Sequence, residues 1–170
     1  TARSTAQSVP FFLETGQNLA SRLASEPQLT QTADGDLPAY LSERMQSIPY
    51  FNQLVVFDAS SASLVAGYPT ELPAQLTQQE EAGLLLVQQG VPNQVYAIPP
   101  LTPGEAARVS FFAAIPGTTR VLVARTDFKA NPYMRALVEN LNGMQELNGV
   151  GLLVDDQGII LYHPQAEQIM

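Results

Sequence analysis

Residues 149 to 164, GVGLLVDDQGIILYHP, contain two apolar runs separated by a short polar segment. The runs extend from Val150 to Val154 and from Ile159 to Tyr162. Two β-prone runs around an Asp/Gly-rich break are typical of a β-hairpin. Gly158 can adopt the positive φ that such a turn needs, and Pro164 cannot extend a strand ladder. The sequence therefore predicts a hairpin that ends before Pro164.

A helix is predicted directly before this hairpin, from Asn131 to Leu147. Asn131 is suited to cap it, Gly149 is suited to end it, and one helical stripe is apolar: Leu137, Val138, Leu141, Met144 and Leu147. At about 1.5 Å per residue, such a helix would carry the hairpin some 25 Å away from the preceding segment.

Five strands are predicted further upstream: Leu54–Asp58, Leu64–Tyr68, Gln94–Ile98, Arg108–Ile115 and Arg120–Thr126. The last two are apolar without alternation, which indicates a sheet that is covered on both faces. A helix from Thr77 to Gln89 separates the second strand from the third. Thr77 and Glu80 have the spacing of a capping box at its start.

Two helices are predicted before the strands. The first spans residues 8 to 25, with Ser8 as its N-cap and Pro10 in its first turn. Its inner face would carry Val9, Phe12, Gly16, Leu19, Ala20 and Leu23. A glycine in mid-helix costs about 1 kcal/mol relative to alanine, so Gly16 indicates that another element comes close. The second helix is predicted from Leu37 to Ser47, capped by Asp36.

This order of elements resembles the double Cache (PAS-like) sensor domains of bacterial receptors. Two stretches carry the resemblance: VLVARTDF at residues 121–128 and the closing hairpin. The hairpin is in turn similar to residues 58–69, DASSASLVAGYP, as two copies of one module would be. The implied fold class is α+β, with a long N-terminal helix packed on a five-stranded antiparallel sheet. Residues 1–130 would form the membrane-distal module. Residues 131–170 would form the connecting helix and first hairpin of an incomplete membrane-proximal module.

The resemblance implies that the chain is the extracytoplasmic ligand-sensing part of a receptor anchored in the bacterial cytoplasmic membrane. A small solute would bind between the sheet and residues 69–107, and a helix shift would pass to a histidine kinase, chemoreceptor or cyclase output. The net charge of −8 argues against binding to nucleic acid or to an anionic membrane surface. The first helix makes a homodimer the expected assembly.

Four residues are candidates for ligand binding: Tyr68, Tyr96, Arg125 and Asp127. Arg125 and Asp127 lie two apart on a predicted strand, so their side chains would share one face. They either compensate each other at the strand end or clamp the carboxylate and amine of a ligand. In amino-acid-binding relatives, an Arg and a Trp hold the carboxylate, whereas Tyr residues and an Asp hold the amine. Because this chain has no Trp, the ligand stays open among amino acids, carboxylates and amines.

No catalytic, cofactor or metal site is predicted. His163 is the only histidine and there is no cysteine. The sequence also has no motif typical of a catalytic nucleophile and no spacing typical of metal ligands. Two other functions remain open, a ligand-free dimerisation module and an acidic secreted hydrolase. The hairpin would have open edges and an apolar face. It is expected to dock on the connecting helix, on the distal module or on a second chain, and a contact with a second chain is preferred over a freely solvated hairpin.

Overall fold

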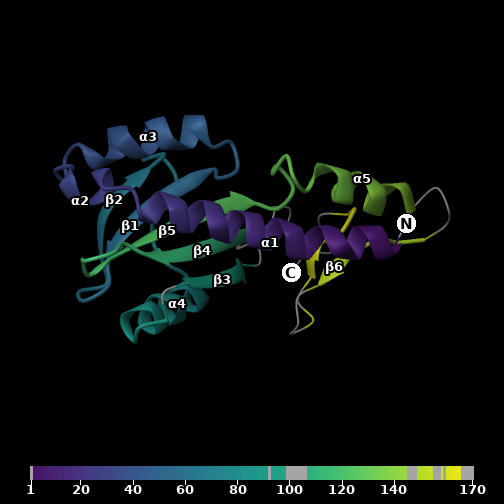
Figure 1. Cartoon of the computed structure of the whole chain (residues 1–170). Coiled ribbons are helices and arrows are strands. Elements are labelled where there is room, and N and C mark those ends of the chain that lie inside the picture. Colours follow the sequence, from purple (N-terminus) through teal and green to yellow (C-terminus); the bar gives the residue numbers. More distant parts are fainter. Residues whose placement is uncertain are drawn as a thin grey trace.

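The computed structural model describes residues 2–91, 93–98, 107–144, 149–154, 158 and 160–165, and the side chains of all of these except residues 2–7 and 94. The larger part of the molecule is built on one antiparallel sheet, with strand order β2-β1-β5-β4-β3 (Figure 1). Its strands are β1 (Gln53–Asp58), β2 (Ser63–Tyr68), β3 (Asn93–Ile98), β4 (Arg108–Ala114) and β5 (Arg120–Asp127). The five predicted strands are confirmed.

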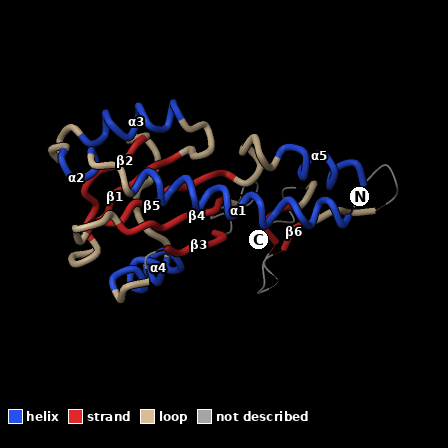
Figure 2. The backbone as a smooth tube through the Cα atoms, in the orientation of Figure 1, coloured by secondary structure: helices blue, strands red, loops and turns tan. Residues whose placement is uncertain are grey.

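The first helix, α1 (Ala2–Ala24), lies along one face of the sheet (Figure 2). Phe12 of α1 is fully buried there with Phe111 of β4. A Cβ atom on Gly16 would lie 2.3 Å from Cζ of Phe111, so the close approach expected at this glycine is confirmed. The helix begins earlier than expected. Ser8 is therefore not its N-cap, and Pro10 lies inside it.

Two further helices, α2 (Gln28–Gln31) and α3 (Leu37–Ser47), complete this face. Leu37 and Leu41 of α3 are buried in the same core as Phe12. The predicted helix is confirmed, but Asp36 does not cap it through its side chain, because its backbone already has helical dihedral angles. An N-cap residue normally needs an extended backbone to direct its side chain at the first amides.

The opposite face of the sheet is covered by α4 (Gln78–Gln88). Leu84 and Val87 of α4 pack on a smaller apolar cluster: Val55, Phe57, Phe112, Val121 and Val123. Both faces are thus buried, as the unbroken apolar runs of β4 and β5 indicated. The predicted capping box is also confirmed, with both reciprocal hydrogen bonds between Thr77 and Glu80.

The last helix, α5 (Arg135–Gly143), begins four residues later than the predicted segment. Leu147, at the predicted end of the helix, lies outside the described residues. Asn131 does not cap α5. Its side chain instead accepts a hydrogen bond from the backbone N–H of Tyr133 at 2.8 Å and donates to the carbonyl of Tyr50 at 2.8 Å. These bonds hold Asn131 in the turn between β5 and α5, so the helix can start only after it.

The closing hairpin is confirmed as a separate two-stranded sheet of β6 (Leu153–Val154) and β7 (Ile160–Tyr162). Gly158 has the expected positive φ of 84°; Asp155 and Asp156 lie outside the described residues. The hairpin docks on α5 of its own chain. Tyr162 donates a hydrogen bond to Oδ1 of Asn142 at 2.7 Å, and a Cβ on Gly151 would meet the carbonyl of Leu141 at 2.7 Å. The preferred contact with a second chain stays a prediction.

Candidate functional site

A row of side chains crosses the face of the sheet that α4 covers. In the strand register, Arg125 of β5 lies opposite Gln53 of β1 and Ser110 of β4, and Ser110 lies opposite Tyr96 of β3. Residues that are opposite in neighbouring strands point to the same face. Arg108 and Asp127 form the next pair along β4 and β5. The antiparallel register therefore gathers polar residues from four strands beneath the start of α4.

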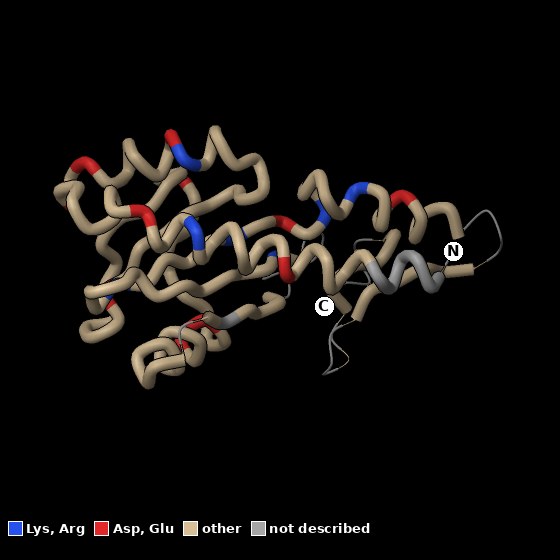
Figure 3. The backbone as a smooth tube through the Cα atoms, in the orientation of Figure 1, with Lys and Arg blue, Asp and Glu red and all other residues tan. Residues whose placement is uncertain are grey.

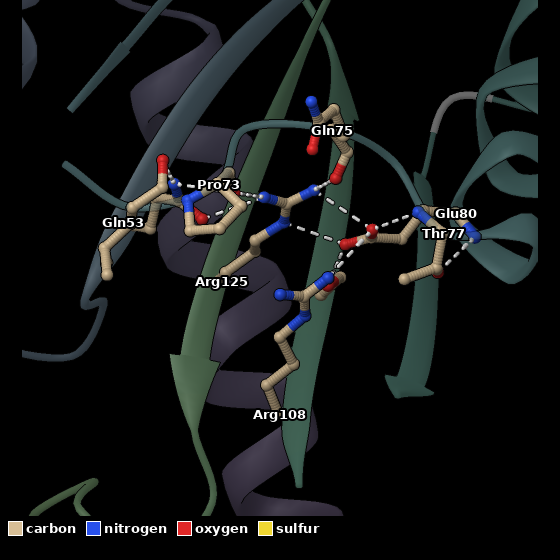
Figure 4. A network of polar contacts seen from close by, with 9 residues as sticks. Gln53, Pro73, Gln75, Thr77, Glu80, Arg108 and Arg125 are labelled. Atoms are coloured by element: carbon tan, nitrogen blue, oxygen red, sulfur yellow. Dashed lines mark hydrogen bonds and ion pairs between the residues drawn. The ribbon is translucent and has the colours of Figure 1, made fainter. Parts of the chain in front are cut away.

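Arg125 is the centre of this row and is 1% exposed. Its Nε and Nη2 atoms donate to the two carboxylate oxygens of Glu80 at 2.8 and 3.0 Å (Figure 4). Nη1 donates to Oε1 of Gln53 and to the carbonyl of Pro73, and Nη2 also donates to the carbonyl of Gln75. A guanidinium has five N–H donors, and these five bonds use all of them. Arg125 has no donor left for a ligand.

Glu80 is fully buried, and its carboxylate accepts five hydrogen bonds, two of them from Arg125. The other three come from Oγ of Ser110 at 2.6 Å, from the backbone N–H of Thr77 at 2.9 Å and from Nη2 of Arg108 at 3.3 Å. Burial alone would raise the pKa of Glu80, but the charge of Arg125 and the hydrogen bonds from Ser110 and Thr77 hold it below its usual value. Burial lowers the pKa of Arg125, against the opposing effect of the Glu80 charge, but an arginine stays protonated. The pair is therefore ionised at neutral pH.

This network fixes the connection between β2 and α4 to the sheet. Nε2 of Gln53 donates to the carbonyls of Leu72 at 3.3 Å and Pro73 at 3.2 Å, while Arg125 binds the carbonyls of Pro73 and Gln75. Glu80 ties the first turn of α4 to the same guanidinium. Residues 72–75 have no regular secondary structure, but backbone carbonyls of this segment are bound by the buried side chains of Gln53 and Arg125.

A cavity of about 730 Å³ lies beside this pinned segment. Its walls come from β1, the β1–β2 turn, β2, residues 70–76 and α4. Its larger apolar lining residues are Phe57, Leu64, Leu72, Leu76, Leu84 and Leu85, and its polar lining residues are Thr70, Gln75, Glu81 and Gln88. Since Leu72 and Gln75 belong both to the cavity wall and to the network, the Arg125–Glu80 pair sets the position of that wall.

Three of the four predicted ligand-binding residues lie on this face of the sheet, and none of the three lines the 730 Å³ cavity. The guanidinium of Arg125 is fully engaged within the protein. Asp127 is half-buried and its Oδ1 accepts from the backbone N–H groups of Lys129 at 2.7 Å and Ala130 at 2.9 Å. Tyr96 packs edge-on against Phe112, with ring centroids 5.8 Å apart. In this structure Arg125 forms a buried ion pair with Glu80, and Asp127 accepts hydrogen bonds within a turn. A joint role of the two as a ligand clamp stays a prediction.

Tyr68 is the fourth predicted residue, and it lies on the other face. It is opposite Leu54 in the β1–β2 register and packs with Leu54 in the core on the α1 side. It does not share the face of the other three residues, because a register shift in the β1–β2 ladder between Val56 and Phe57 decides which β2 side chains face α4. Its role in ligand binding stays a prediction. Tyr50 is likewise a core residue, whose hydroxyl donates to the carbonyl of Phe12.

The residues that sequence reasoning missed are Glu80, Gln53 and the cavity lining. The capping box fixed the position of Glu80 on α4, but its buried partner comes from a strand 45 residues later. His163 interacts only with Gln165 among the described residues. Among those residues there is also no cluster of His, Cys, Asp or Glu that would hold a metal ion. No helix in the described ranges has the length and apolar character of a membrane span.

Comparison with known proteins supports the fold. No protein-family model matches the chain, and no curated protein matches it. Among solved structures, the ligand-binding domain of the Pseudomonas aeruginosa amino acid chemoreceptor PctC, in complex with GABA, has a TM-score of 0.68 at 19% identity. The match covers 98% of this chain and 74% of that one. The ligand-binding domain of the chemoreceptor PctB, in complex with L-Gln, has a TM-score of 0.64 at 19% identity and covers 99% and 67%. The chain therefore shares the α+β fold of these ligand-binding domains, and the predicted fold class is confirmed.

Proposed function

We propose that this domain senses a small organic solute as the extracytoplasmic part of a membrane-anchored bacterial receptor. The fold it shares with chemoreceptor ligand-binding domains supports this function. In the proposed receptor, the ligand shifts the equilibrium between two arrangements of α4 and the sheet, and the terminal helices carry that change to an output domain. Such a shift requires that the ligand bind one arrangement more tightly than the other.

One observation carries the proposal. Three large apolar side chains that are exposed to solvent, Leu64, Leu72 and Leu85, all line the 730 Å³ cavity. Scattered exposed leucines need no explanation, but an apolar surface gathered in one concave site is typical of a binding pocket. The volume falls within the range of pockets for small ligands, roughly 300–1,000 Å³. A bound solute would remove these leucines from water.

In this proposal, residues 1–130 are the sensor module, and residues 131–170 are the connecting helix and first hairpin of a membrane-proximal module. The separate sheet of β6 and β7, which does not continue the five-stranded sheet, supports this division. A homodimer formed through α1 is the proposed assembly.

Thermal-shift and calorimetric titration with amino acids, carboxylates and amines would test the proposal. A specific ligand stabilises the folded state in proportion to the logarithm of its concentration relative to Kd, by about 2.7 kcal/mol at one hundred times Kd. We expect a specific rise in Tm with at least one class of solute and saturable binding by calorimetry. The variant Ala74→Phe, which fills the cavity from its wall, should abolish that rise.

Ala39→Phe is the matched control, because Ala39 is exposed on α3 and does not line the cavity. It should leave the ligand response unchanged. If no solute in the panel stabilises the protein, the domain is a ligand-free interaction module instead. If a solute binds equally well to the Ala74→Phe variant, the binding site lies elsewhere.

A further inference from the structure

The cavity has a chemical character that points to one class of ligand, provided that the proposed sensing function holds. Glu81, Leu84, Leu85 and Gln88 all line it from α4. Their spacing of three and four residues places them on one stripe of the helix. A carboxylate, two leucines and an amide therefore face the cavity side by side.

The two arginines of the network, Arg125 and Arg108, lie outside the lining of this cavity. All five donors of Arg125 are bonded to Glu80, Gln53 and the backbone of residues 73 and 75. Arg108 pairs with Glu80 at 3.3 Å. Neither arginine belongs to the lining of this cavity, so neither guanidinium is in place to receive a ligand carboxylate there.

The remaining charges favour a cation. The first turn of α4 carries both Glu80 and Glu81, seen as the acidic start of that helix in Figure 3. Arg125 neutralises Glu80, whereas the Glu81 carboxylate at the cavity forms no ion pair with any of the described residues. The whole chain has a net charge of −8, which attracts cations over longer distances.

We infer that the cavity takes an organic ammonium ion with an aliphatic or aromatic body, and that it needs no ligand carboxylate. The body would cover Leu64, Leu72 and Leu85, and the ammonium would donate hydrogen bonds to the Glu81 carboxylate. The glutamines at positions 75 and 88 supply neutral polar groups at the same wall.

Three compounds with nearly the same body test this inference: 2-phenylethylamine, 2-phenylethanol and 3-phenylpropionate. By isothermal titration, the amine should bind most tightly and the carboxylate most weakly. Glu81→Gln should weaken amine binding about fivefold, the value of a partly exposed ion pair, and leave the alcohol unchanged. Binding of the amine should also weaken as the salt concentration rises.

Glu14→Gln is the control, because Glu14 is an exposed carboxylate on α1 outside the cavity. It should leave all three affinities unchanged, and an equal loss in both variants would show that only net charge matters. If the carboxylate or a zwitterion binds more tightly than the amine, and Ala74→Phe abolishes that binding, the ammonium inference fails while the sensing function stands. If Ala74→Phe changes nothing for any binding solute, the proposed cavity itself is wrong.

Discussion

Arg125 and Glu80 form a buried ion pair, with Nε of the arginine 2.8 Å from Oε1 of the glutamate, although 45 residues separate them in the chain. The arginine projects from the central strand β5, and the glutamate completes the capping box of α4. The pair is therefore the link between the sheet, the first turn of α4 and the segment that walls the cavity.

Removing one partner of this pair should be strongly destabilising. Arg125→Leu leaves the buried Glu80 with only the 3.3 Å contact to Arg108 as a counter-charge. We expect a loss of about 3–5 kcal/mol in the free energy of unfolding, measured by urea denaturation. The control Arg135→Leu breaks the exposed pair of Arg135 and Glu139 and should cost less than about 1 kcal/mol. Similar losses in both variants would contradict the structural role of Arg125.

The stability should depend on pH through Glu80. Its pKa is held below the ordinary value of 4.5 in the folded protein, so the contribution of the pair is fully present above that pH. The contribution is lost as the pH falls through the folded-state value. Glu80→Gln cannot be ionised, and the difference in unfolding free energy between the unsubstituted protein and this variant should shrink from pH 6 to pH 2. A constant difference over that range would show that folding does not lower the pKa of Glu80.

Gly16 should resist even the smallest substitution. A Cβ there would lie 2.3 Å from Cζ of Phe111, so Gly16→Ala must displace a fully buried ring. We expect a net loss of about 1–2 kcal/mol, since overpacking exceeds the gain in helix propensity. Gly143→Ala, in α5 with nothing within 4 Å, should instead be neutral or stabilising. If Gly16→Ala also raises the Tm, the close contact of α1 and β4 is wrong.

The hairpin should detach from α5 before the main sheet unfolds. Even a Cβ at Gly151 would lie only 2.7 Å from the carbonyl oxygen of Leu141, so Gly151→Val should push the two segments apart and break the hydrogen bond between Tyr162 and Asn142. Amide hydrogen exchange should then rise in β7 and stay unchanged in β5. Gly149→Ala is the control, because the nearest atom to its Cβ would be 3.4 Å away. Unchanged protection of β7 in the Gly151→Val variant would contradict this docking.

The sequence by itself determined the strands, the helices other than α2 and their order. Apolar runs and turn residues were sufficient for the five strands, because strand periodicity is a local property of the chain. The capping box at Thr77 and Glu80 was readable for the same reason, as both of its hydrogen bonds lie within one turn. Gly16 was also informative, because a glycine in mid-helix is costly unless another element needs the space.

Only the tertiary structure decided which side chains meet. Arg125 and Asp127 share a face as the spacing predicted, but their partners are set by strand register and by the packing of α4. Tyr68 faces the α1 side because the β1–β2 ladder shifts register, and no local pattern marks that shift. Glu80 pairs with Arg125, 45 residues later in the chain, because a buried charge needs a partner. The fold places this guanidinium within hydrogen-bonding distance of both carboxylate oxygens.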